Sequence, residues 1–250
     1  MNRALLNFLL FCLVLLIAGV GAALWFGLGM VRIAFDEEQR QQPMMVLQLS
    51  RHKRSVNHAG HDNQIDISEA FRAPMASLMN AEGGVYRWRA SLDYAAQGSV
   101  ENEWEYADLV FFPEAAGYVK VATGSAYREL VNAYPEVAKM TLASQRIPSR
   151  PWPSGVIVLI AYQASATDGG SRMEVLLPGL ASSSGELVWD TGVTPLGSES
   201  FWNRLMAIHF ADRGHAEAWL YDPDTEVERS ILAAHNPHMT TLVFRAGKVN

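Results

Sequence analysis

His209 is the residue whose type and position most suggest chemistry. It falls within an expected strand, residues 205–210, where an earlier copy of the same motif carries Phe111. An imidazole changes its charge near neutral pH, so His209 could act as a general base or as an axial ligand of a metal or a haem. A histidine held by structural hydrogen bonds is the alternative reading of this position.

Two further candidate ligand-binding residues fall at strand ends. Arg51 follows the first expected strand of the first copy, and Tyr162 ends the equivalent strand of the second copy. A guanidinium at the end of a strand could hold a carboxylate, because its planar fork of donors matches two carboxylate oxygens. Both residues are therefore expected to border a cavity between sheet and helices.

Aromatic residues supply the remaining candidates. Trp88 and Trp189 occupy matching positions in the two copies, which favours a packing role, although they could also form the walls of a pocket. By the two-residue alternation of a strand, Tyr86 is expected to share a face with Trp88, and Arg87 to share the other face with Arg89. We count Tyr86, Trp88 and Trp189 as candidate ligand-binding residues.

Histidine clusters are present, but their spacing does not predict a metal site. His58, His61 and Asp62 place two imidazoles and one carboxylate in a loop, and His235 and His238 flank a helix end. A zinc site usually needs a third or fourth ligand at a characteristic spacing. We find no such partner in the sequence and expect no metal site.

Several signatures of catalysis and nucleic-acid binding are missing. The sequence contains no Gly-x-Ser-x-Gly elbow, P-loop, His-Glu-x-x-His helix or dinucleotide motif, which disfavours hydrolases and nucleotide-dependent enzymes. A formal net charge of −6, with one short basic run at residues 51–54, argues against nucleic acid as a partner. No motif implies a cofactor, although a haem is compatible with His209.

The first 35 residues have the character of a membrane anchor. Residues 4–26 carry no charged side chain, and the apolar character continues to Phe35, whereas about 20 apolar residues cross a hydrocarbon core. A cleavable signal peptide is the alternative. The short N-terminal tail favours an inner-membrane protein with its C-terminal domain outside the cytoplasm. The expected partners are the lipid bilayer, a membrane protein that contacts the small residues at 18–23, and a small-molecule ligand.

A repeat organises the rest of the chain. The stretch from Trp104 to Phe112 returns as 202–210, and Gly84-Val-Tyr-Arg-Trp88 is matched by Gly185-Glu-Leu-Val-Trp189. Two matching landmarks in the same order indicate two copies of one module. The predicted organisation is an anchor at 1–35, a linker at 36–42, a first module at 43–146, a proline-rich linker at 147–154 and a second module at 155–246.

Each module is expected to follow the order strand, helix, strand, strand, helix, strand. In the first module the strands are expected at 44–49, 85–92, 107–112 and 137–142, with helices at 68–83 and 114–131. In the second they are expected at 155–162, 187–192, 205–210 and 239–244, with helices at 172–181 and from 212 to 235. This order predicts an α+β protein built from tandem ferredoxin-like modules. Because each such sheet has one bare face, we expect the copies to pack sheet on sheet as an intramolecular pseudo-dimeric α/β barrel behind one transmembrane helix.

Two segments resemble a known family. The run Phe112-Pro-Glu-Ala-Ala-Gly-Tyr118, followed by Ser125-Ala-Tyr-Arg-Glu-Leu130, is similar to a small bacterial family of unknown function in the dimeric α/β-barrel superfamily. Asp222-Pro-Asp-Thr-Glu226 resembles a turn of that family, and the resemblance spans about residues 43–246. Family members are mostly soluble single modules that pair between chains. The anchor and the duplication depart from that arrangement.

The resemblance implies a fold and leaves the function open. The wider superfamily includes monooxygenases, haem enzymes, isomerases and modules that only bind ligands, and a fold does not choose among them. With no catalytic motif, the expected function is a small-molecule-binding or partner-docking module held at the membrane. The alternative is an enzyme, such as a monooxygenase, an isomerase or a haem-linked protein, acting on a small apolar substrate.

Overall fold

The computed structural model describes residues 35–52, 67–97, 104–148, 150–164, 179–180, 182–196, 202–236 and 238–246. The expected anchor at 1–35 lies outside these residues except for Phe35. Within the described ranges, no helix has both the length and the apolar character that crossing a membrane requires.

The first half of the protein, residues 35–148, follows the expected order of elements. Its last expected helix is divided at Gly124 into two shorter ones, and a short helix precedes the first strand. The elements are α2 (Glu37–Arg40), β1 (Met44–His52), α3 (Ile67–Ala81), β2 (Val85–Gln97), β3 (Tyr106–Phe112), α4 (Ala115–Thr123), α5 (Ser125–Ala133) and β4 (Val137–Ser144).

The second half, residues 150–246, has the same order of strands and an outer pair of helices. Of the helix expected at 172–181, only residues 179–180 are described, and they form a turn. The elements are β5 (Val156–Tyr162), β6 (Glu186–Gly192), β7 (Thr194–Pro195), β8 (Arg204–Phe210), α6 (Arg213–Leu220), α7 (Pro223–His235) and β9 (Thr240–Ala246).

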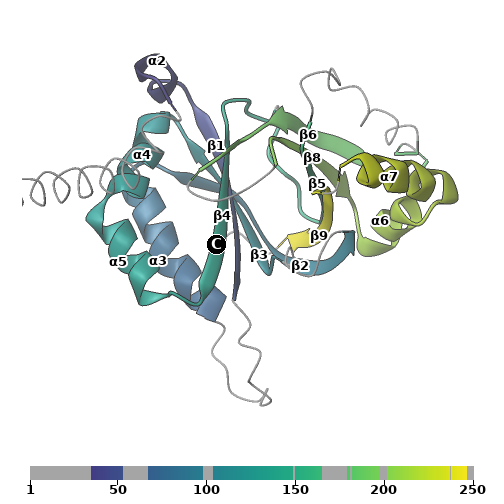
Figure 1. The fold of residues 1–250 in the computed structure, drawn as a ribbon, viewed down its shortest axis with the longest axis horizontal. Helices are drawn as coiled ribbons and strands as arrows, with labels where there is room; N and C mark the ends of the chain where they lie inside the picture. Colours follow the sequence, from purple (N-terminus) through teal and green to yellow (C-terminus); the bar gives the residue numbers. More distant parts are fainter. Residues whose placement is uncertain are drawn as a thin grey trace, which may run out of the picture.

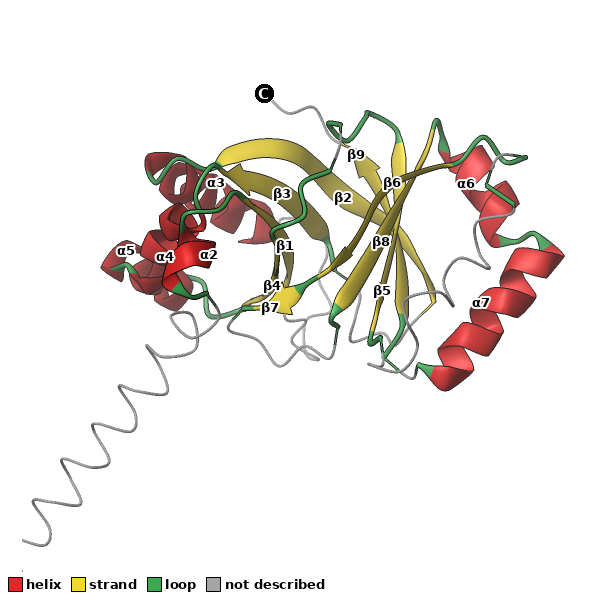
Figure 2. Cartoon of the chain, turned by 90° about the horizontal axis from the view of Figure 1, so that it is seen from above, coloured by secondary structure: helices red, strands yellow, loops and turns green. Residues whose placement is uncertain are grey.

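The nine strands formed by the described residues belong to one antiparallel sheet, in the order β6-β8-β5-β9-β2-β3-β1-β4-β7. The sheet curls into a nearly closed barrel, because β7 directly follows β6 in the chain and pairs with β4 at the opposite end of the order. A hydrogen bond of 2.7 Å between the hydroxyls of Ser144 and Thr191 also joins these ends. Figures 1 and 2 show the helices on the outside, with α3, α4 and α5 on one side and α6 and α7 on the other. The expected α+β class and barrel are confirmed.

Strand β2 ties the two halves together. Its first part pairs with β3, whereas residues from Ala90 to Gln97 pair with β9 of the second half. Tyr94, near the end of β2, packs against the core beneath the helices of the second half. Each half therefore contributes to the folding of the other.

The segment expected as a linker at 36–42 is attached to the first half. Asp36 and Gln39 form a reciprocal capping box that starts α2. Phe35 is buried in the core beneath α3 and α4, and the amide of Ala115 donates to the carbonyl of Gln42. The segment from Phe35 to Gln42 is therefore packed against the first half.

The glycines of the repeat have a packing role. A Cβ on Gly84 would lie 2.8 Å from the ring of Phe112, and one on Gly185 would lie 2.6 Å from the ring of Phe210. Both distances are shorter than van der Waals contact allows, so only glycine lets these rings pack against the backbone. The matched Gly and Phe positions in the sequence thus correspond to the same glycine–phenylalanine packing contact, which is made once in each half.

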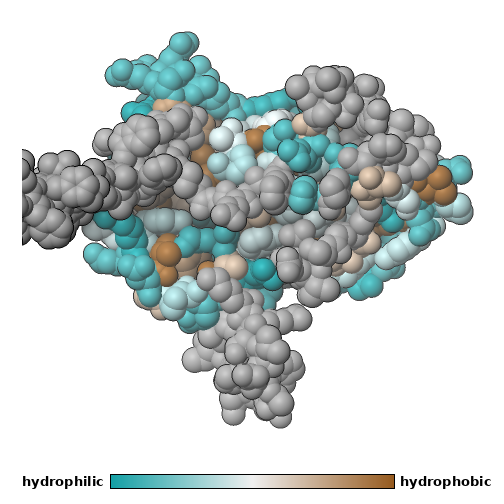
Figure 3. Space-filling view, viewed as in Figure 1, coloured by the Kyte–Doolittle hydropathy of each residue, from teal (hydrophilic) through white to brown (hydrophobic). Residues whose placement is uncertain are grey.

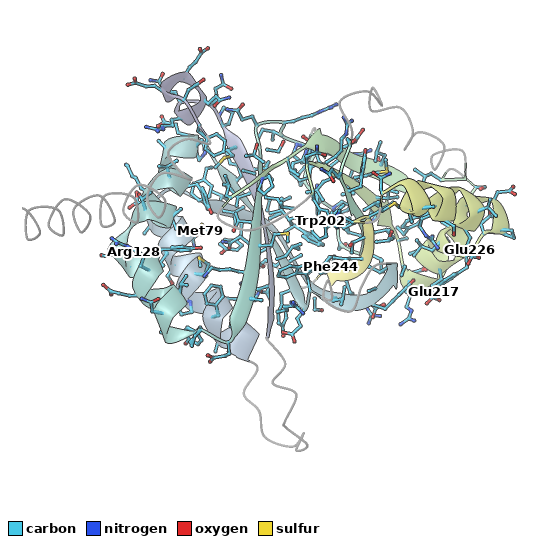
Figure 4. All side chains as sticks on the ribbon, in the orientation of Figure 1. Met79, Arg128, Trp202, Glu217, Glu226 and Phe244 are labelled. Atoms are coloured by element: carbon cyan, nitrogen blue, oxygen red, sulfur yellow. The ribbon has the colours of Figure 1, made fainter. Side chains whose placement is uncertain are left out.

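Tryptophans fill the interior of the barrel. Trp88 and Trp189 lie on either side of Trp152, with ring centroids 4.8 Å and 5.8 Å from its ring. Trp152 comes from the segment 147–154, which was expected to be an inter-domain linker, yet its side chain is only 5% exposed. Figure 4 shows Trp202 and Phe244 in this same space, whereas Met79 lies on the helix side of the first half.

Candidate functional site

On the side of the sheet that faces the helices of the first half, polar side chains lie next to one another across neighbouring strands. Arg89 of β2 lies beside Asp108 of β3. On the other side of Asp108 lies Gln48 of β1, and Gln48 lies beside Thr141 of β4. A second row, two residues along each strand, consists of Ser91, Tyr106, Ser50 and Lys139.

A buried ion cluster lies at the centre of these rows. Arg72 of α3 donates from Nε and Nη2 to the two oxygens of Asp108, at 2.9 Å and 2.5 Å. Arg89 donates from Nε to one of the same oxygens at 3.0 Å. The side chains of Arg72 and Asp108 are only 9% and 7% exposed, so two guanidiniums share one carboxylate away from water.

Aromatic rings hold both guanidiniums in place. The guanidinium of Arg72 lies 4.4 Å from the ring centroid of Tyr106, and that of Arg89 lies 5.0 Å from the ring centroid of Tyr86. Stacking of this kind stabilises a cation and fixes the plane of its donors. Burial, and then the negative charge of Asp108, raise the pKa of Tyr86 well above its ordinary value. Tyr86 therefore keeps its proton at neutral pH.

The equivalent surface of the second half is largely apolar. Strand register places Met206 where the first half has Asp108, and Ile160 where it has Gln48. Both side chains belong to the hydrophobic core beneath α6. Since both halves fold with the same strand order, the fold itself does not require the buried ions of the first half.

Two hollows lie next to the cluster. A cavity of about 10 Å³, lined among others by Ser50, Arg72, Asp108 and Lys139, lies between α3 and the sheet. That is close to the smallest space able to hold one water molecule. An open groove of about 470 Å³ lies between α5 and β4. Lys139 lines both hollows. The groove is lined by Val131, Asn132, Tyr134, Pro135, Val137, Ala138 and Lys139.

The expected site residues are distributed over both faces of the sheet. The imidazole Nε2 of His209 lies 2.8 Å from the carbonyl of Ser154, at the end of a strand whose alternate residues face the barrel interior. Arg51 also faces the interior, with its guanidinium 5.6 Å from the ring of Trp104. Tyr162 instead packs beneath the helices of the second half, where burial raises its pKa to about 12. These three residues are not brought together.

The expected strand faces of β2 are wrong. Trp88 lies in the barrel interior, whereas Tyr86 packs against the core beneath α3. A β-bulge between Tyr86 and Trp88 adds one residue to the strand and breaks the alternation. For the same reason Arg87 and Arg89 point to opposite faces, with Arg87 over the ring of Phe111 and Arg89 against Asp108. An equivalent bulge precedes Trp189 in β6.

The histidine clusters are only partly described by the structure. Residues 58–62 lie outside the described part of the chain. Among the residues that the structure describes, no three histidine, cysteine or acidic side chains are placed to share a metal ion. His238 contributes its carbonyl, which accepts a hydrogen bond of 2.7 Å from the indole of Trp202.

Comparison with known proteins leaves the function open. No protein-family model matches this sequence, and no curated protein matches it at a significant level. Solved structures do share its general arrangement. A proposed monooxygenase from Lactobacillus acidophilus is 13% identical over 82% of this chain and 94% of its own, with a TM-score of 0.43.

Two other solved structures are similar at the same level. A heme-binding protein from Thermus thermophilus is 10% identical over 83% of this chain and 92% of its own, with a TM-score of 0.35. A protein of unknown function from Rhodopseudomonas palustris is 19% identical over 47% of this chain and 92% of its own, with a TM-score of 0.37. Identities and TM-scores this low describe only the arrangement of strands and helices, and they carry no information about ligands or activity.

Proposed function

We propose that the first half of this protein binds a small, largely apolar molecule in the groove between α5 and β4. We further propose that the halves are copies of one ferredoxin-like module, of which the second has kept only the role of completing the barrel. The observation that carries the proposal is the difference between the halves. Buried polar residues lie behind the groove in the first half, where the second half has Met206 and Ile160.

The groove has the size and lining of a small-molecule site. Its volume of about 470 Å³ lies within the range of roughly 300–1,000 Å³ that ligand pockets occupy. Its exposed lining is about evenly divided between polar and apolar surface, with polar side chains supplied by Asn132 and Lys139 and apolar ones by Val131, Pro135 and Val137. Figure 3 shows apolar atoms among hydrophilic ones on this side of the first half. Two polar groups can orient a ligand, whereas a reaction usually needs more groups that converge.

Lys139 connects the groove to the polar interior. Its ammonium lies 5.4 Å from the ring centroid of Tyr127 and 6.0 Å from that of Phe71, between the helices and the sheet. A ligand whose body lies in the groove would direct its polar end toward this cation. The cavity beside Ser50 and Arg72 then lies directly behind that end.

The membrane remains the proposed location, on the strength of residues 1–35 alone. The apolar run there is long enough for an inner-membrane anchor, with the described domain outside the cytoplasm. The burial of Phe35 supports a close attachment, because it fastens the end of that run to the first half. Under this proposal the groove is presented at a fixed distance from the bilayer.

Replacing Val131 with glutamate is expected to weaken ligand binding about tenfold or more, because a carboxylate in an apolar groove opposes an apolar ligand. The probe is 4-fluorobenzyl alcohol, which is small, neutral and mostly apolar. Its affinity for the full-length protein is measured from the broadening of its fluorine resonance. The matched control is Val227→Glu, the same change at a 56% exposed position of α7, which should leave the affinity within about twofold.

Equal loss in both variants would show that the probe responds to charge anywhere on the protein. Binding that survives Val131→Glu would place the probe outside the groove. Either result contradicts the proposal.

A further inference from the structure

Two donors at the β2 end of the polar rows are buried and have no acceptor among the residues that the structure describes. They are the Nη2 group of Arg89 and the hydroxyl of Tyr86. The guanidinium of Arg89 lies 5.0 Å from the ring of Tyr86, so the two residues form one local site. A buried donor without an acceptor is costly, and native proteins rarely leave one unexplained. An acceptor that binds between these residues would satisfy both.

The backbone places these donors together by means of the bulge. Residues three apart in a regular strand point to opposite faces. The extra residue between Tyr86 and Trp88 turns Tyr86 to the same face as Arg89. The second half contains the same bulge, but it carries Leu187 and Asp190 at the matching positions. The pair of donors is therefore a feature of the first half and is not required by the bulge.

The charge around the site favours an anion. Arg72 and Arg89 share the single carboxylate of Asp108, so these three side chains carry one net positive charge. A cation would be repelled by the guanidiniums. Tyr86 stays protonated at neutral pH, since burial raises its pKa, and its hydroxyl can therefore donate a hydrogen bond to an incoming oxygen.

We propose that Arg89 and Tyr86 bind the carboxylate of a small organic acid, at a site separate from the groove. One carboxylate oxygen accepts from Arg89 Nη2 and the other from the Tyr86 hydroxyl. The side chain of Arg89 is 26% exposed and Tyr86 is half-buried, so solvent reaches the residues although their polar ends point inward.

This site does not depend on the proposed function. Tyr86 and Arg89 lie on β2, and the groove lies beside β4, with β3 and β1 between them in the sheet. A variant at one site therefore tests that site without altering the lining of the other.

The test compares 4-fluorobenzoate with its neutral counterpart 4-fluorobenzamide, by fluorine NMR on the full-length protein. We expect benzoate to bind the wild type at least about tenfold more tightly than the amide. Tyr86→Phe removes only the hydroxyl and should weaken benzoate binding about tenfold, the effect of losing one hydrogen bond to a charged group. Because the hydroxyl has no partner in the free protein, this variant should be as stable as the wild type.

The matched control is Tyr94→Phe, which removes a second buried tyrosine hydroxyl from the same strand. Its benzoate affinity should stay within about twofold of the wild type. Equal binding of acid and amide would overturn the carboxylate assignment, as would unchanged benzoate affinity in Tyr86→Phe. Benzoate binding that is lost in Val131→Glu and kept in Tyr86→Phe would place the acid in the groove and also overturn it.

Discussion

The variant Trp152→Ala is expected to lose about 3–5 kcal/mol of unfolding free energy, the usual cost of deleting a buried tryptophan ring. Trp152 is 5% exposed and contacts Trp88 and Trp189 from the two halves. Its removal would leave a cavity at the centre of the core that both halves share. Urea denaturation of the full-length protein measures the change.

The control for this prediction lies in the same segment. Ile147 is 38% exposed, so Ile147→Ala should cost less than about 1 kcal/mol. If Trp152→Ala were as mild as Ile147→Ala, the segment 147–154 would be a linker after all. The tryptophan would then not hold the halves together.

The variant Asp108→Asn is expected to lose about 3 kcal/mol of unfolding free energy. Removing the charge takes from the buried guanidinium of Arg72 the carboxylate that accepts two of its hydrogen bonds, and it weakens the contact with Arg89. Breaking a buried pair by changing one member costs about 3–5 kcal/mol, because the other charge stays away from water. The change is measured by denaturation at constant pH and ionic strength.

The second half offers the matched control. Arg204 donates to both oxygens of Asp190, but these side chains are 27% and 29% exposed. Asp190→Asn should therefore cost less than about 1 kcal/mol, as is usual for ion pairs in contact with solvent. A similar loss in both variants would mean that the cluster around Asp108 is no more isolated from water than an ordinary surface pair.

Local periodicity was sufficient to predict the order of the eight longer strands and the positions of most of the described helices. The alternation of apolar residues in β8 and the helical stretch after Asp212 both reappear in the structure. The repeated Gly and Phe landmarks correspond to a packing contact made twice. Such features depend on neighbours close in sequence, and their pattern is therefore visible without coordinates.

The barrel interior could not be predicted in the same way. Three prolines in residues 147–154 indicated an extended linker, and the chain there is indeed irregular. Proline restricts the backbone but does not determine whether a neighbouring side chain is buried. Trp152 enters the core because the single curled sheet closes around it, which only the tertiary arrangement shows.

The candidate site depended even more on distant contacts. Arg72 and Asp108 are 36 residues apart. In the sequence, Arg72 has the pattern of an ordinary charged residue of an amphipathic helix. The signal that could have found the cluster was the alignment of the copies, since Asp108 stands where the second copy has Met206. The bulge in β2 also removed the simple alternation from which the position of Tyr86 was predicted.

We propose that the two halves of the barrel have different roles, with ligand binding confined to the first. Hydrogen–deuterium exchange of the full-length protein tests it most directly, with and without 4-fluorobenzyl alcohol at several times its dissociation constant. We expect slower exchange in α5 and β4, residues 125–144, and no change in α7 and β9, residues 223–246. Protection of 223–246, or of both regions equally, would contradict the division of roles.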